Sequence, residues 1–256
     1  MNPATVRTGM VGLGLVSSSH YKGYATHPAA QVVAVCDIDP GRAEQFAHEK
    51  GIPEVYTSYE EMLRKADINI VDIATPTYLH IPMALQAIEA GKHVHCEKPF
   101  CRYVGEGLSA CQAVRQVGVK LVVAETYVFI SSHQKARELI DAGEIGKPLQ
   151  IRQRHGAWIE REIPLIGTGP EDRSWRLDPQ KSGGGDYPWI FDHAGHFFAT
   201  AEYFMPGQRI VEVYALAATC RGAAKSGAAH DPYSTARIDI PLITWKFEDS
   251  DCQGVW

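Results

Sequence analysis

The chain has 256 residues, of which 45% are hydrophobic and 21% are charged, and its formal net charge at pH 7 is −5. A chain of this length can bury the cores of two modest domains. The negative net charge and the lack of any Lys/Arg run argue against nucleic acid and against an anionic membrane surface as partners, because both are met by a basic face.

The first residues, MNPATVRTG, lack the basic segment and the apolar region of a secretory signal, and no later run approaches the roughly 20 apolar residues of a membrane span. We therefore expect a cytoplasmic protein. The cysteines lack the Cys-x-x-Cys spacing of a structural zinc site, and their scatter predicts reduced, mostly buried thiols rather than disulfides. They are Cys36, Cys96, Cys101, Cys111, Cys220 and Cys252.

Short apolar runs typical of strands alternate with helical segments through the first half of the chain. This alternation predicts an α/β domain built on a doubly wound parallel sheet, with helices on both faces. The expected strands cover residues 6–12, 31–37, 68–75, 93–97 and 120–125, and the expected helices cover 18–26, 40–51, 58–66, 78–91 and 107–118.

Glycines and polar residues follow these strands at their carboxyl ends, where such sheets bind ligands. In GLGLVSSSH, Gly12 and Gly14 match the first two glycines of a dinucleotide-binding turn, whereas Ser17 stands where a third glycine is expected. Asp37 ends the second strand, at the distance where a carboxylate usually receives an adenosine ribose. Two alternatives remain: the glycines can serve the turn alone, and Asp37 can simply begin the turn before Pro40.

The second half of the chain predicts a sheet with one covered face, because its strands alternate polar and apolar residues. A glycine-rich loop, SGGGDYP, precedes a further helix at about 189–204. On that helix Asp192 and His196 are four residues apart and project from one face, which His193 also reaches. The other expected elements are a helix at 131–142 and strands at 149–158, 210–219 and 236–249.

Taken together, these segments are similar to the Gfo/Idh/MocA family of glucose–fructose oxidoreductases and inositol dehydrogenases. The resemblance spans nearly the whole chain, and its most specific part is EKP after a GKHV strand. It implies an amino-terminal Rossmann domain at 1–124 and, at 125–256, a substrate-binding and oligomerisation domain with an open, mostly antiparallel sheet. Because family members usually run longer, we expect the second domain to be incomplete. The motifs are GLGLVSSSH, VAVCDIDP, ATPTYLH, GKHVHCEKPF, ARELIDAGEIGKP, WRLDPQKSGGG and DHAGH.

The resemblance implies a nicotinamide-dependent transfer of hydride to or from a secondary alcohol or carbonyl of a sugar, polyol or related small molecule. A sensor that binds NAD(P) on the same fold without turnover is the alternative. Asp37, followed by Ile38 rather than by an arginine, favours NAD over NADP, although Arg42 could still reach the site. The implied cofactor contacts are Gly12, Gly14, Leu15, Val16, Asp37, Ile38, Thr75, Pro76, His80, Glu97 and Lys98.

Three interpretations of DHAGH remain open. Asp192 can cap its helix while His196 is a buried structural histidine. Alternatively, Asp192, His193 and His196 offer oxygen and nitrogen ligands for a metal, as the strand pair His93 and His95 does. In the third interpretation the segment is the catalytic Asp-x-Gly-x-His pattern of the family. Ala194 replaces the glycine of that pattern.

The family resemblance favours the catalytic interpretation, and we expect no metal ligand. An alcohol hydroxyl must lose a proton as hydride leaves its carbon, and the unperturbed histidine pKa of about 6.5 suits a base, which we assign to His196. Lys98 would donate to the oxygen as it becomes alkoxide-like, and Asp192 would orient these groups. Lys98, Asp192 and His196 are thus the expected catalytic residues, and with Tyr127 they are the expected substrate contacts.

Overall fold

The computed structural model of the protein describes residues 5–154, 175, 178–185, 187–221 and 237–256. The chain is divided into two compact units. Met1–Ala124 and Pro164–Gly185 form the first, and Glu125–Ile163 and Asp186–Trp256 form the second. The described residues of the second segment, 175 and 178–185, thus group with the first unit, although they lie within the span that the sequence predicts for the second domain.

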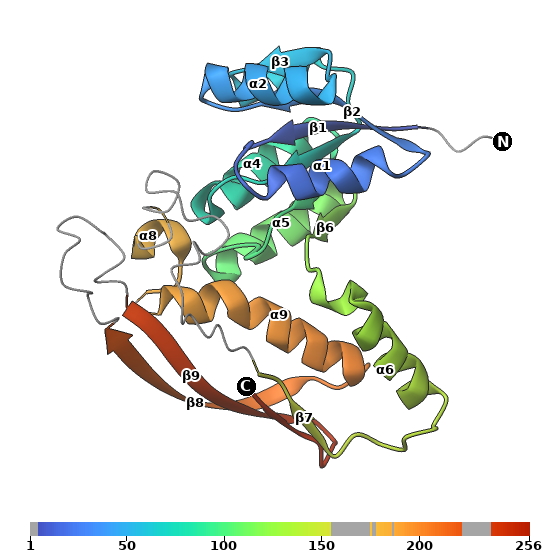
Figure 1. Ribbon diagram of the computed structural model, residues 1–256, viewed down its shortest axis with the longest axis vertical. Coiled ribbons are helices and arrows are strands. Elements are labelled where there is room, and N and C mark those ends of the chain that lie inside the picture. Colours follow the sequence, from blue (N-terminus) through green and yellow to red (C-terminus); the bar gives the residue numbers. More distant parts are fainter. Residues whose placement is uncertain (1–4, 155–174, 176–177, 186, 222–236) are drawn as a thin grey trace. The chain divides into compact units, whose positions relative to one another are not determined.

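The first unit contains a six-stranded parallel sheet in the order β3-β2-β1-β4-β5-β6 (Figure 1). This order, with its reversal between β1 and β4, is that of a doubly wound Rossmann-type sheet, which confirms the predicted fold class. The strands are β1 (Val6–Val11), β2 (Ala30–Cys36), β3 (Glu54–Tyr56), β4 (Ile70–Ile73), β5 (His93–Cys96) and β6 (Leu121–Val123).

Helices cover both faces of this sheet, so successive strand residues enter different cores. In β1, Met10 belongs to the core that contains Phe46 of α2, whereas Val11 belongs to the core that contains Met62 of α3. Strands that are buried on both faces favour apolar runs, and β2 carries one at residues 32–36. The helices are α1 (Ser17–Ala25), α2 (Pro40–Lys50), α3 (Tyr59–Lys65), α4 (Thr77–Glu89), α5 (Val104–Val117) and α8 (Pro179–Ser182).

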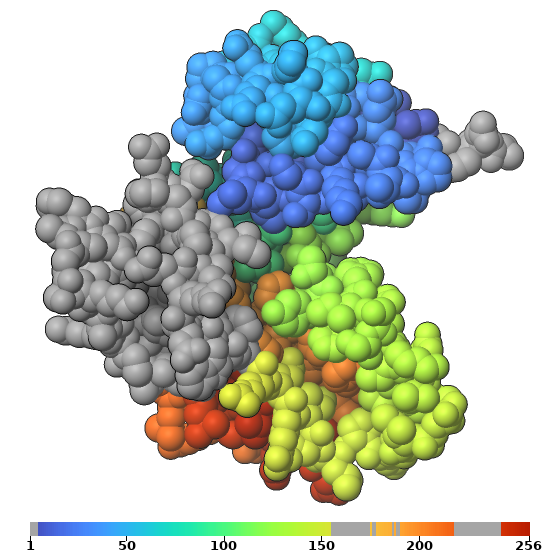
Figure 2. Space-filling model, in the orientation of Figure 1, coloured from blue at the N-terminus to red at the C-terminus, as the bar shows by residue number. Residues whose placement is uncertain are grey.

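Local signals in the sequence explain where α2 begins and ends. The Asp39 side chain accepts a hydrogen bond from the backbone N–H of Arg42, Pro40 follows as the first helical residue, and Gly51 ends the helix with a φ of 68°. One side of α2 is buried, and its other side faces outward in light blue in the space-filling view (Figure 2).

Helix α8 joins the first unit through Arg102. The guanidinium of Arg102 donates to the carbonyl oxygen of Gln180 at 2.5 Å. Gly183, which ends α8, has a φ of 87°, and a Cβ placed there would lie 2.8 Å from the Arg102 backbone. This close approach explains why part of the glycine-rich SGGG segment packs with the first unit.

The second unit contains a four-stranded sheet in the order β7-β10-β9-β8, with one parallel pairing, β7 with β10, and two antiparallel ones. The mostly antiparallel sheet of the prediction is therefore present. The short strand β10 was not expected, and the strand expected at 149–158 is limited to β7 before residue 155, beyond which it lies outside the described residues. The strands are β7 (Gln150–Arg152), β8 (Ile210–Arg221), β9 (Arg237–Phe247) and β10 (Gln253–Val255).

Helix α9 covers one face of this sheet. Phe197 and Ala201 of α9 pack with Ile243 and Phe247 of β9 in a common core. On the edge strand β8, by contrast, apolar side chains including Val213 are exposed. The homo-oligomer expected to form through this sheet stays a prediction. The helical elements are η1 (Tyr127–Phe129), α6 (Ser131–Asp141) and α9 (Pro188–Phe204).

Two general expectations concern thiols and membranes. Within the described part of the chain, no helix has the length and apolarity that a membrane span requires. Five of the six cysteines lie among the described residues, and all five are free thiols, as the sequence predicts. They are Cys36, Cys96, Cys101, Cys111 and Cys252.

The core of the second unit depends on a glycine opposite a tryptophan. Gly254 of β10 pairs with Trp245 of β9, whose side chain is buried. A Cβ placed on Gly254 would overlap the Trp245 indole ring. The indole therefore occupies the space that a side chain at residue 254 would need.

We expect Gly254→Ala to lower the free energy of unfolding by about 1–3 kcal/mol, because overpacking forces the indole or the strand to move. Urea unfolding followed by circular dichroism measures this change. Gly195→Ala is the matched control, because it adds the same methyl group on α9, where no atom lies within 4 Å of the added Cβ. The control should be neutral or stabilising, and equal losses in both variants would contradict the explanation.

Candidate functional site

The turn between β1 and α1 requires glycine at its first position. Gly12 has a φ of 83°, and a Cβ placed there would lie 2.7 Å from the Ala74 carbonyl oxygen and 2.8 Å from Cγ2 of Thr75. The Gly12 N–H also donates to the carbonyl oxygen of Cys36 at 3.0 Å. The turn is thus packed against the segment that follows β4 and bonded to the end of β2.

The second and third positions of the turn differ from each other. A Cβ placed on Gly14 would meet no atom within 4 Å, so space is open above this residue. Ser17, in the place of the third glycine, is fully buried, and its hydroxyl donates to the carbonyl oxygen of Gly14 at 2.5 Å. Leu15 and Val16 are exposed, and no side chain caps the first turn of α1. Open space beside an uncapped helix start fits an anionic group.

Asp37 ties the end of β2 to the glycine turn. One carboxylate oxygen accepts from the Leu13 N–H at 2.8 Å, and the other accepts from the Asp39 N–H at 3.0 Å. Only 6% of Asp37 is exposed, and the Arg42 guanidinium lies 3.7 Å from its carboxylate. Each oxygen keeps a second lone pair for a ligand hydroxyl, whereas the next residue, Ile38, points its side chain into solvent.

His80 joins the segments that follow β4 and β5. Its Nε2 lies 2.8 Å from the Thr75 carbonyl oxygen, and its Nδ1 lies 2.8 Å from the Pro99 carbonyl oxygen. Burial lowers the pKa of His80 and outweighs these two contacts, which favour the charged ring. His80 thus holds the Thr75–Pro76 and Lys98–Pro99 segments together from within, with 1% of its surface exposed.

The Glu97–Lys98–Pro99 turn lies at the carboxyl end of β5. The Glu97 N–H donates to the carbonyl oxygen of Ile73 at 2.8 Å, and the Lys98–Pro99 peptide bond is cis. The Glu97 carboxylate lies 3.1 Å from Nε2 of His20, a residue of α1 that the sequence did not single out. The first unit therefore brings Gly12, Asp37, Thr75 and Glu97 to one edge of its sheet, as predicted from their positions after strands.

In the second unit, His196 of α9 is held by two residues. Its Nδ1 lies 2.7 and 2.8 Å from the two carboxylate oxygens of Glu125, and the Tyr127 ring stacks on the imidazole with 4.2 Å between centroids. The Tyr127 N–H donates to Glu125 at 2.8 Å. Glu125 was not predicted, although it follows a strand in the same way as Asp37 and Glu97 do, so the same rule could have found it.

Asp192 lies one turn before His196 on α9, and its carboxylate is 3.7 Å from Nδ1 of His193. Among the described residues, the group of three side chains close enough to share a metal ion consists of His20, Asp72 and His95, and not of the three DHAGH residues. The predicted site residues are divided between the two units. Lys98 belongs to the first unit, whereas Tyr127, Asp192 and His196 belong to the second.

A cavity of about 240 Å³ lies beside Tyr127 in the second unit. Of the residues predicted to contact substrate, Tyr127 lines this cavity, whereas His196 does not. The lining residues are Tyr127, His133, Ile151, Arg152, Gln153, Arg154, Phe197, Thr200 and Phe204.

Comparison with known proteins gives matches to both halves of the chain. Residues 6–125 match the model of the oxidoreductase family with an NAD-binding Rossmann fold, GFO_IDH_MocA, and residues 133–249 match the GFO/IDH/MocA C-terminal domain. A solved structure, the oxidoreductase domain protein from Kribbella flavida, superposes with a TM-score of 0.79 at 26% identity, covering 99% of this chain and 67% of that one.

Two curated relatives come from Bacillus subtilis (strain 168). The uncharacterized oxidoreductase YrbE is 29% identical over 242 residues, which are 94% of this chain and 64% of that protein. The scyllo-inositol 2-dehydrogenase (NAD(+)) is 39% identical over 148 residues, 57% of this chain and 43% of that protein. The chain thus spans about half to two thirds of the length of these relatives. Matches to both of its characteristic domains show that the chain belongs to the GFO/IDH/MocA family of oxidoreductases.

Proposed function

We propose that the protein is an NAD-dependent oxidoreductase that transfers hydride between a nicotinamide and a secondary alcohol or carbonyl of a sugar or polyol. The observation that carries this proposal is the pairing of Glu125 with His196, which lies in the segment that matches the family's C-terminal domain. A relative named scyllo-inositol 2-dehydrogenase (NAD(+)) supports a cyclic polyol as the substrate class.

The cofactor is proposed to lie on the carboxyl edge of the parallel sheet. Gly14 leaves room for the pyrophosphate, and the uncapped start of α1 supplies N–H groups for it. Asp37 would accept the hydroxyls of the adenosine ribose, while Thr75, Pro76 and Glu97 would line the nicotinamide half. When bound, the nicotinamide supplies the hydride acceptor or donor.

His196 is proposed as the general base. A carboxylate only accepts hydrogen bonds, so the Glu125 contact places the ring proton on Nδ1 and leaves Nε2 with a free lone pair. Nε2 would then remove the proton of the substrate hydroxyl as hydride leaves the carbon that bears this hydroxyl. The stacked Tyr127 ring restricts rotation of the imidazole and so fixes the direction of that lone pair.

Lys98 and Asp192 are proposed to complete the set. The Lys98 ammonium would donate to the substrate oxygen while negative charge develops on it, and Asp192 would orient the hydroxyl or the two other side chains. The substrate is a small molecule, and the second unit is proposed to hold it and to form the contacts of a homo-oligomer. The free cysteines support a reducing compartment, which we propose is the cytoplasm.

We expect tighter binding of NAD(H) than of NADP(H). Asp37 would repel a ribose 2′-phosphate, although Arg42 beside it offsets part of that repulsion. Titration of the protein with both reduced cofactors, followed by nicotinamide fluorescence, measures the ratio of the NADPH dissociation constant to the NADH dissociation constant. Asp37→Asn should reduce this ratio, because it removes the charge and keeps one accepting oxygen. The matched control is Asp39→Asn, at an exposed carboxylate, and a preference for NADP(H) in the unmodified protein would overturn this assignment.

We expect Lys98→Ala, His196→Ala and Glu125→Gln each to lower the turnover rate by about 100- to 10,000-fold while the NADH dissociation constant stays nearly unchanged. Glu125→Gln acts through the ring, since its amide can donate to Nδ1 and shift the proton to Nε2. Turnover is followed by nicotinamide absorbance with a panel of inositols and sugars.

His193→Ala serves as the control, because His193 lies on α9 close to His196 and is not among the proposed catalytic residues. Loss of activity in this control as well as in His196→Ala would favour the metal interpretation of DHAGH. Tight NADH binding without turnover on any member of the panel would replace the enzyme with the sensor.

A further inference from the structure

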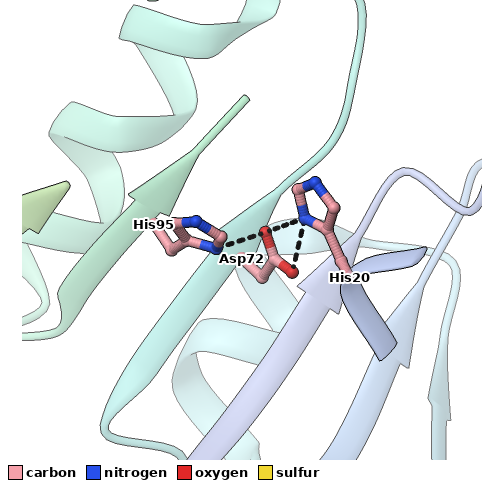
Figure 3. Close-up of side chains that lie close together, drawn as sticks. All are labelled: His20, Asp72 and His95. Carbon is pink, nitrogen blue, oxygen red and sulfur yellow. Dashed lines mark hydrogen bonds and ion pairs between the residues drawn. The ribbon is translucent and has the colours of Figure 1, made fainter. Parts of the chain in front are cut away.

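A cluster of titratable side chains lies inside the first unit and has no place in the proposed reaction. It consists of His20 of α1, Asp72 of β4 and His95 of β5 (Figure 3). Asp72 is fully buried, and the side chain of His20 is 9% exposed. Burial of an uncompensated carboxylate is costly, so its partners determine what the cluster can do.

His20 stands between two carboxylates. Its Nδ1 lies 2.9 and 3.0 Å from the two oxygens of Asp72, and its Nε2 lies 3.1 Å from Oε1 of Glu97. An ionised carboxylate can only accept, so both ring nitrogens must donate. This geometry requires the doubly protonated, positively charged imidazole.

The surrounding groups support the charged ring. Burial alone lowers the pKa of His20, but the hydrogen bonds and negative charges of Asp72 and Glu97 outweigh it and raise the pKa from 6.5 to about 10. The pKa of Asp72 is lowered by its bonds with His20 and His95, although burial opposes this change.

Besides His20, two titratable groups lie beside Asp72: His95, the third member of the cluster, and Tyr24. Nδ1 of His95 lies 3.3 Å from Asp72, and the Tyr24 hydroxyl of α1 lies 3.0 Å from the same nitrogen. Burial and the Asp72 charge raise the pKa of Tyr24, so it stays neutral. Among the described residues of α1, β4, β5 and the turn after β5, the group that lies within ion-pair distance of Asp72 besides His20 is therefore His95.

We propose that His20 is a positioning residue for the Glu97–Lys98–Pro99 turn: anchored on Asp72, its imidazolium fixes the Glu97 carboxylate and through it the placement of Lys98. The functional part of this proposal rests on the proposed role of Lys98 in hydride transfer. The arrangement also ties α1, which begins at the glycine turn, to the turn that carries Lys98. One helix thus links the proposed pyrophosphate site with the proposed alkoxide donor.

Stability alone does not account for these charges. Replacing buried ion pairs with apolar side chains of similar volume is often neutral or stabilising, so a buried carboxylate–imidazolium–carboxylate chain is weak evidence for a purely structural role. Its directional bonds do restrict Glu97 to one orientation, as an apolar cluster could not.

The protonation state is tested first, without any need for turnover. Nuclear magnetic resonance of the histidine ring nitrogens should show His20 doubly protonated up to pH 8, and Asp72→Asn should bring its titration to a lower pH. A His20 ring that titrates near pH 6.5 in the unmodified protein would overturn the proposal, even if Asp72→Asn does not fold.

The coupling to Lys98 is tested by acetylation with acetic anhydride and mass spectrometry, with Lys92 and Lys120 as internal references. In His20→Gln, the Glu97 carboxylate loses its imidazolium partner and competes for the Lys98 ammonium. We therefore expect the acetylation rate of Lys98 to fall to about one third of its value in the unmodified protein, or lower. His48→Gln, on the outer side of α2, is the matched control. Unchanged acetylation of Lys98 in His20→Gln would overturn the link.

Kinetics then separate positioning from cofactor binding. His20→Gln should lower kcat by about 10- to 100-fold, the effect of a misplaced reacting group, with little change in the NADH dissociation constant. Slower acetylation of Lys98 in His20→Gln, together with no turnover in the unmodified protein, would keep the link to Lys98 and reject the proposed function. Stoichiometric binding of Co²⁺ or Zn²⁺ that is lost in His20→Gln would instead assign the cluster to a metal.

Discussion

The structure of the first unit depends on one constraint: a parallel sheet places the carboxyl ends of all its strands at the same edge. The segments after β1, β2, β4 and β5 meet there, and a small number of hydrogen bonds joins them to one another. The Gly12 N–H reaches the end of β2, Asp37 reaches back to the glycine turn, and His80 joins the segments after β4 and β5. These contacts preorganise the edge before any ligand binds, because buried backbone groups already have their partners.

Hydrophobic patterning predicts most of the fold because most elements are long enough to repeat a pattern. The strands that were missed, β3 and β10, have three residues each and contain charged, polar or glycine residues, so only their neighbours in the sheet make them strands. Local signals at Pro40, Gly51 and Ser58 predict helix limits closely, because the interactions at a helix end are local. The grouping of α8 with the first unit depends on Arg102, far away in the chain, and no local signal reports it.

The candidate site is predictable where a residue type and a strand end coincide, as for Asp37 and Glu97. Partners are harder to predict, because a hydrogen bond between distant residues leaves no spacing in the sequence. Glu125 and His196 are 71 residues apart, and His20 and Asp72 are 52 apart. His80 illustrates another case: its motif predicts a cofactor contact, which stays a prediction, while its contacts with two carbonyl oxygens show a supporting role that the motif does not reveal.

The packing of Gly254 beneath Trp245 constrains how the sequence can change over evolutionary time. While the indole stays, residue 254 has one acceptable side chain, a hydrogen atom; once a smaller residue replaces Trp245, many side chains fit at 254 and help to refill the core. The order of substitutions therefore matters, because a change at 254 first creates a clash and a change at 245 first creates only a cavity. Homologous chains should accordingly show correlated residues at these two positions, with glycine at 254 wherever tryptophan stands at 245.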